Sequence, residues 1–182
     1  FLLFIGFGSF AQSEPGKAKR NIIWFMPSKT REINGVAVGP VMTYRYPQRV
    51  NGLSVELIGT GFFPLLMPKS TMMEKQANDT IHQHINGLGL SVTGTLNNAL
   101  QVNGMLVNTF IGLSGKCHGL QVSSMYNFTG DLKGVALSFF NEADTAKGLQ
   151  IGFMNKINNS AGTLQIGLWN INNKRQLPLI NW

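Results

Sequence analysis

The chain contains very little cysteine and little negative charge. Only one of its 182 residues is a cysteine, Cys117. A single cysteine excludes an internal disulfide framework and any zinc site built from several thiolates. Eight acidic residues stand against fifteen lysines and arginines, and charged residues make up 13% of the sequence, about half of the usual share. With 43% hydrophobic residues, this composition excludes a disordered chain, because disorder requires high charge and few apolar groups.

The excess of positive charge does not form a nucleic-acid-binding motif. The formal net charge is +7, but the lysines and arginines are scattered and form no long basic run. We therefore expect no nucleic-acid partner. The short cluster Lys17-Ala18-Lys19-Arg20 is interpreted as a solvated arm, with contact to anionic lipid headgroups as the alternative.

The first residues have the pattern of a secretory signal. Phe1 to Phe10 form an apolar run that is followed by Ala11, Gln12 and Ser13. A run of about ten residues is too short for a membrane-spanning helix, which needs ~20, but it fits the hydrophobic region of a signal peptide. We expect residues 1–12 to be a signal-peptide remnant and the protein to be exported, to the outer membrane or cell surface. The alternative is a buried first strand or helix.

A repeat of about fifteen residues organises the remainder of the chain. Each copy begins with a small residue, after which positions +1, +3 and +5 are large and apolar while +2 and +4 are small or polar. The exceptions are Pro40, Thr109 and Ser124 at +5 and Leu106 at +2. Strict alternation of this kind predicts strands. The eight copies begin at Gly35, Gly52, Gly87, Gly104, Gly119, Gly134, Gly148 and Thr163. Further strands are predicted at 21–26 and 176–182, with a long loop at about 64–83. Residues 13–182 thus read as one all-β domain.

Two architectures fit this repeat, and the first is an antiparallel meander. Four of the units begin at the glycine of an Asn-Gly pair, and this pair favours the type I′ turn of a hairpin. Such a meander is expected to close into an up-and-down barrel of about 8–10 strands. The apolar columns at +1, +3 and +5 would face lipid, and the glycine, serine and glutamine side would line the interior.

The second architecture is a β-solenoid with coils of about fifteen residues, in which each coil contacts only its neighbours. In that fold we expect the leucine, isoleucine and phenylalanine columns to stack inward as a dry core. The glutamine and glycine side would form a flat outer face. Asn141, Asn155 and Asn170 would form a ladder at one corner.

The last copies carry a resemblance to a known group of proteins. Residues 148–152 read Gly-Leu-Gln-Ile-Gly and residues 164–167 read Leu-Gln-Ile-Gly, followed by Asn155 and Asn170. This resembles the bacterial surface-repeat proteins with Gly-Leu-Gln-Ile-Gly-x-x-Asn type repeats, closely over 119–182 and loosely over 33–110. The resemblance implies a surface location and supplies no catalytic residues.

Few residues are candidates for chemistry. His82 and His84 flank Gln83 and would share one face of a strand, so they are weak candidates for a metal pair, with Asp79 or His118 as a third ligand. Two solvated loop histidines explain the pair more simply. Cys117 is expected to be buried or idle. Neither a Gly-x-Ser-x-Gly nor a phosphate-loop pattern occurs, and no motif identifies a small-molecule ligand.

We therefore predict no catalytic residues, no cofactor and no metal site. The expected function is that of a non-enzymatic β-repeat protein of the envelope or cell surface, as an outer-membrane barrel or structural element. The alternative is a β-solenoid module for adhesion or binding. A remote alternative is a metal-dependent enzyme that uses His82 and His84.

Overall fold

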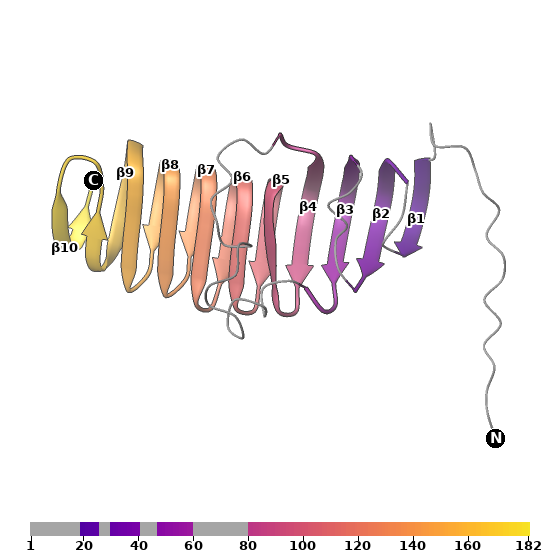
Figure 1. Cartoon of the computed structure of the whole chain (residues 1–182), viewed down its shortest axis with the longest axis horizontal. Coiled ribbons are helices and arrows are strands. Elements are labelled where there is room, and N and C mark those ends of the chain that lie inside the picture. The colour runs from indigo at the N-terminus through magenta and orange to yellow at the C-terminus, as the bar shows by residue number, and fades with distance from the viewer. Residues whose placement is uncertain (1–18, 26–29, 41–46, 60–79) are drawn as a thin grey trace, which may run out of the picture.

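Ten strands pair side by side in chain order, from β1 to β10, in a single sheet (Figure 1). The computed structural model describes residues 19–25, 30–40, 47–59 and 80–182. The expected signal peptide and most of the expected loop lie outside these ranges, and no helix occurs within them. The strands are β1 (Lys19–Phe25), β2 (Glu32–Gly39), β3 (Gln48–Glu56), β4 (Gln83–Ser91), β5 (Gly94–Asn108), β6 (Ile111–Ser123), β7 (Tyr126–Leu137), β8 (Phe140–Ile151), β9 (Met154–Ile171) and β10 (Gln176–Asn181).

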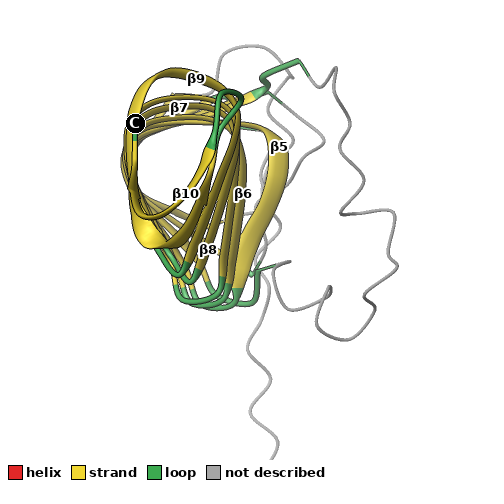
Figure 2. Ribbon diagram, turned by 90° about the vertical axis from the view of Figure 1, so that its left-hand side faces the viewer, coloured by secondary structure: helices red, strands yellow, loops and turns green. Residues whose placement is uncertain are grey.

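All neighbouring strands from β1 to β9 run parallel, and only β10 runs antiparallel, against β9. Viewed along the stack, successive strands superimpose in a rounded outline (Figure 2). The fold is therefore a β-solenoid. The all-β prediction and the solenoid alternative are confirmed, whereas the antiparallel meander closing into a barrel is wrong.

The Asn-Gly pairs explain why the hairpin interpretation failed. Asn51 and Gly52 lie inside β3 and not in a turn between strands. They pair in register with Asn34 and Gly35 in β2. Gly52 has a φ of 135°, so the strand bends here and continues around a corner of the coil. The pair does mark a bend, but the bend does not reverse the chain direction.

The first residues of the repeat copies form one continuous column along the solenoid. The strand registers pair Gly35, Gly52, Gly87, Gly104, Gly119, Gly134, Gly148 and Thr163 in succession. The repeat boundaries that the sequence predicts are thus confirmed residue by residue. A one-residue slip would exchange the two faces of every strand, and the glycine column prevents it.

The apolar core is built mainly by residues that lie two positions before each of these glycines. These side chains are nearly or completely buried and pair in register: Ile33, Val50, Ile85, Val102, Cys117, Leu132 and Ala146. The same cluster also contains Ala37, Leu100, Leu106, Ala136, Ala143 and Ile157. A fully buried column of this length supplies the hydrophobic stabilisation that one coil could not provide for itself.

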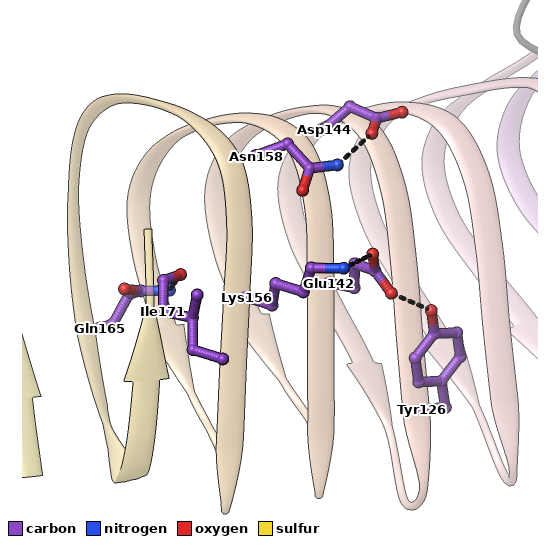
Figure 3. Close-up of polar contacts among 7 residues, drawn as sticks. All are labelled: Tyr126, Glu142, Asp144, Lys156, Asn158, Gln165 and Ile171. Atoms are coloured by element: carbon purple, nitrogen blue, oxygen red, sulfur yellow. Dashed lines mark hydrogen bonds and ion pairs between the residues drawn. The ribbon is translucent and has the colours of Figure 1, made fainter. Parts of the chain in front are cut away.

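The inward residues after each glycine are those at position +2, and several of them are polar. Gln121, Gln150 and Gln165 have no exposed surface. The sequence-based expectation for a solenoid was the reverse, with the glutamines outside and the leucine and isoleucine columns inside, and that expectation is wrong. The glutamines are tolerated inside because they bond to buried polar groups. The Nε2 of Gln165, for example, donates to Gln150 Oε1 at 3.1 Å. It also donates to the carbonyl of Ile171 at 3.1 Å, and Figure 3 shows these two residues.

A ladder of asparagine side chains runs through the interior of the last coils. Asn127 donates to Asn141 at 3.2 Å, Asn141 to Asn155 at 2.9 Å, and Asn155 to Asn170 at 2.7 Å. All four side chains are buried. The predicted ladder of Asn141, Asn155 and Asn170 is confirmed, and it extends one coil further.

Candidate interaction surface

Because the +2 residues point inward, the alternating +1 and +3 residues point outward. The two columns they form follow the strand registers from β2 to β9 without a gap. We call them the apolar face: Val36, Leu53, Leu88, Met105, Leu120, Val135, Leu149 and Leu164 at +1, and Val38, Val55, Leu90, Val107, Val122, Leu137, Ile151 and Ile166 at +3.

It is unusual for sixteen apolar side chains to lie on one outer face of a protein. None of them belongs to the buried core. Met105, Ile151, Leu164 and Ile166 are exposed, at 38–39%, and the others are half-buried. Exposed apolar surface in a contiguous patch of this kind marks an interaction site, whereas single exposed leucines do not.

A second group of apolar side chains borders the apolar face at the bends between the later strands. We call Phe139, Phe140, Phe153 and Trp169 the aromatic ridge; they are 48%, 37%, 43% and 42% exposed. The rings of Phe139 and Phe153 stack with centroids 4.7 Å apart, and Phe140 meets Phe139 edge to face at 4.8 Å. The bends gather along one edge of the stack (Figure 2), so the ridge forms one side of the apolar face.

The opposite border of the apolar face is polar and becomes basic toward the carboxyl-terminal coils. It is the column immediately before the glycines: Asn34, Asn51, Asn86, Asn103, His118, Lys133 and Lys147. The four asparagines bond to one another along the stack, each at 2.7 Å. Lys133 Nζ lies 3.5 Å from Asp131 Oδ2, and Lys147 is exposed.

The strand segments that precede the glycine corner carry polar residues on their outer side. The Lys156 ammonium lies 2.9 Å from Glu142, whose other oxygen accepts the Tyr126 hydroxyl at 2.8 Å (Figure 3). Asn158 donates to Asp144 at 2.8 Å (Figure 3). Burial and the neighbouring Glu142 raise the pKa of Tyr126, so it remains a neutral hydrogen-bond donor. The solenoid is therefore apolar on one outer face and polar on another.

The histidine pair proposed from the sequence is not assembled into a metal site within the described residues. Gln83 between the two histidines is buried and belongs to β4, while His82 is exposed and His84 is half-buried. Burial, aided by the charge of Arg49, lowers the pKa of His84, so it is neutral at pH 7. No group of three histidine, cysteine or acidic side chains converges in the part of the chain that the structure describes, and Asp79 lies outside it.

Of the remaining titratable residues, Cys117 and Glu56 lie in the interior and His118 lies on the polar border of the apolar face. Cys117 is completely buried in the core column, and burial raises the pKa of its thiol to about 12. His118, the next residue, lies on the outer border with Nε2 3.8 Å from Asp131 Oδ2. Glu56 is fully buried and accepts the Thr95 hydroxyl at 2.8 Å. The arrangement does not give Cys117 the thiolate that a nucleophile requires.

The carboxyl-terminal end of the stack is closed by β10, which adds an antiparallel strand to β9. Asn181 is buried there and donates to Gln165 Oε1 at 3.1 Å and to the Asn170 carbonyl at 3.3 Å. The Arg175 guanidinium sits 4.2 Å from the ring centroid of Trp182. This cap covers the polar end of the interior, and three of its apolar residues are exposed: Leu179, Ile180 and Trp182.

Sequence reasoning found the columns that make the apolar face but assigned them to the core of a solenoid. A second apolar column, two residues before each glycine, could have corrected this assignment, because one interior cannot hold both sets of apolar side chains. No helix long and apolar enough to cross a membrane occurs in the described ranges. In comparisons with known proteins, no family model, no curated protein and no solved structure matches the chain.

Proposed function

We propose that this chain is a non-enzymatic β-solenoid binding module that acts outside the cytoplasm, at the envelope or cell surface. The observation that carries the proposal is the apolar face, which presents sixteen aliphatic side chains in two unbroken outward columns. A solenoid is well suited to binding because it repeats the same contact along an extended surface. The apolar run at residues 1–10 supports export.

The polar interior also supports a binding role. In an ordinary soluble domain the leucine and isoleucine columns would fill the core, since burial of each side chain stabilises the fold by about 1.5–3 kcal/mol. Here Gln121, Gln150 and Gln165 occupy the interior while Ile151 and Ile166 remain outside. An outward apolar column that contributes little to stability is readily explained by contact with something else.

The location is tested by treating intact cells of the natural host with a protease that does not cross membranes. We expect the protein to be degraded while a cytoplasmic marker protein stays intact. Full protection of the protein, together with its recovery in the cytosolic fraction, would contradict the proposal.

The binding role is tested with the double variant Ile151→Asn/Ile166→Asn in the same host. We expect the envelope-associated fraction to fall, because both changes place amides on the apolar face. Thr145→Asn is the matched control, since Thr145 lies on the polar outer side and pairs with Asn159 in the next coil. Equal envelope association of all three chains would exclude the apolar face as the contact surface.

A further inference from the structure

We propose that the apolar face and the aromatic ridge bind the surface of an anionic lipid bilayer. This inference rests on the proposed function and names the occupant of the same surface. It places the solenoid flat on the bilayer, with its long axis in the plane of the membrane.

The extent of the surface fits this occupant. Neighbouring strands are ~4.8 Å apart and residues two apart along a strand are separated by ~6.6 Å, so the two columns at +1 and +3 from β1 to β9 have a footprint on the order of 600 Å². The apolar side chains in this footprint are contiguous, which marks an interaction site where scattered single residues do not. No charged residue occurs in the two columns of the apolar face, and Ile23 and Phe25 of β1 extend it at the amino-terminal end, 58% and 75% exposed.

The aromatic ridge distinguishes a bilayer from a flat protein partner. Phe139 and Phe153 lie at bends along the edge of the face, and Trp169 of β9 lies beside Phe153, whose carbonyl accepts its backbone N–H at 3.2 Å. Stacking a second flat sheet on the apolar face would leave this edge outside the contact. A lipid interface can accept both the face and the ridge, because tryptophan is favoured at headgroup depth and phenylalanine inserts with the other apolar side chains.

The charge distribution favours anionic lipid over a second copy of the chain. Lys133 and Lys147 border the apolar face, and residues 134–182 contain Lys147, Lys156, Lys174 and Arg175 against Glu142 and Asp144, a net charge of +2 from four bases and two acids. The entire chain carries +7. Like charges oppose self-association, whereas apolar insertion and basic side chains act together at an anionic membrane surface.

The test is flotation of the purified full chain with two kinds of vesicle, phosphatidylcholine alone and phosphatidylcholine mixed with phosphatidylglycerol. We expect the wild-type chain to float with the anionic vesicles and to be released in part by high salt, which screens exposed charges. The tryptophan fluorescence should shift to shorter wavelength on binding, and Trp169→Phe should reduce that shift.

Two double variants separate the contributions. Ile151→Asn/Ile166→Asn should lower binding to anionic vesicles by about tenfold or more, because two apolar side chains no longer insert. Lys133→Gln/Lys147→Gln should remove most of the preference for phosphatidylglycerol. Thr145→Asn should bind as the wild type does, and circular dichroism with thermal melting should show that each variant remains folded.

Three results would overturn the inference. One is the absence of wild-type flotation with either vesicle. Another is flotation that the isoleucine variant leaves unchanged. The third is a wild-type dimer in sedimentation that the isoleucine variant splits, which would assign the face to a second copy. These results would not contradict the proposed binding function by themselves. That function would still stand if envelope association in cells depended on Ile151 and Ile166.

Discussion

Glycine at the corner of each coil is required by close approach as well as by backbone conformation. Gly119 has a φ of 142°, and a Cβ at this position would overlap the carbonyl oxygen of Gly104 in the previous coil. An L-residue with a side chain is strained there even before the overlap is counted. The neighbouring coils cannot move apart to relieve it, since they are held by the parallel strand registers on both sides.

Substitution of Gly119 by alanine should therefore lower the free energy of unfolding by about 3 kcal/mol or more. Gly162→Ala is the control. Gly162 has a φ of 91°, but a Cβ added there would meet no atom within 4 Å, so only the backbone contribution of about 1 kcal/mol is expected. Urea denaturation followed by circular dichroism measures both. Equal losses for the two variants would contradict the close-approach explanation.

The interior glutamines should differ in their contributions to stability. Gln121 Oε1 accepts from Thr129 at 2.6 Å and from Ser114 at 3.0 Å, while its Nε2 donates to the Gly112 carbonyl at 2.9 Å. Gln121→Met should cost about 2–3 kcal/mol because buried partners lose their bonds.

Gln150→Met is the matched comparison in the same column. Gln150 Oε1 accepts one bond, from Gln165, and its Nε2 makes no hydrogen bond to the described residues. Its replacement should cost less than about 1 kcal/mol or stabilise the protein, because an unsatisfied buried amide is removed. The two unfolding midpoints in urea should differ clearly, and the reverse order would refute this view of the interior.

Cys117 gives a prediction about pH. Burial raises the pKa of its thiol from the ordinary 9.0 to about 12, so the folded state holds this proton more tightly than the unfolded state does. The stabilising contribution is complete below pH 9 and is lost as the pH rises toward 12. A thiol reagent at about pH 8, where a free thiol is partly ionised, should react with Cys117 only when the chain unfolds in urea. Rapid reaction of the native protein would show that the core column is open.

At the scale of elements, two asparagine ladders support different parts of the stack. Asn34, Asn51, Asn86 and Asn103 form the outer ladder in the earlier coils, where the side chains are partly buried. The inner ladder of Asn127, Asn141, Asn155 and Asn170 follows in the later coils and is fully enclosed. Water can replace a lost partner in the first ladder but not in the second.

Asn155→Ala should consequently destabilise the protein more than Asn86→Ala. Asn155 Nδ2 donates to Asn170 Oδ1 and to the Ile166 carbonyl, and its Oδ1 accepts from Asn141, so about 2–4 kcal/mol should be lost. Asn86→Ala should cost about 1 kcal/mol. Thermal melting of the two variants checks the order, and a larger loss for Asn86→Ala would contradict it.

The strands could be predicted from the sequence because alternation with period two is local information. The copy boundaries, the terminal strands and the ladder of Asn141, Asn155 and Asn170 follow from spacing alone. Alternation does not say which face of a strand is buried. The glutamine face can point inward only because Gln150 and Gln165 bond to each other across coils, and spacing along the chain does not reveal that bond. Asn-Gly is equally compatible with a hairpin and with a bend inside a strand. The candidate surface could not be predicted for the same reason. Its apolar columns at +1 and +3 were recognised in the sequence, but for a solenoid they were expected in the core.

At the scale of the whole molecule, β10 covers the edge of β9. Without it the edge of β9 would present unpaired backbone groups, and open edges of this kind pair with other chains. Pro178, which has no backbone N–H, lies within β10 at the point where the register with β9 shifts, and it removes one backbone donor from this strand. The antiparallel direction of β10 also departs from the repeat, as expected of a terminal capping element.

Deletion of residues 176–182 should therefore cause self-association, since Gln165 and Asn170 lose the bonds from Asn181 and β9 becomes an exposed edge. Light scattering and sedimentation measure the outcome. Leu179→Asn is the control that keeps the cap: Leu179 is 65% exposed with a φ of 65°, a conformation that asparagine tolerates better than leucine. A monodisperse deletion variant would show that β10 is not a cap.

The in-register glycine column also has a consequence for how such a chain can change over generations. Residues 119–133 make one complete coil, and their loss would place Gly134 against Gly104 with every outward and inward position still matched. Duplication of the same stretch would add a coil in the same way. The length of this protein can thus vary in steps of one coil, ~4.8 Å each. Recombination within a gene could lengthen or shorten the apolar face without the invention of a single new contact.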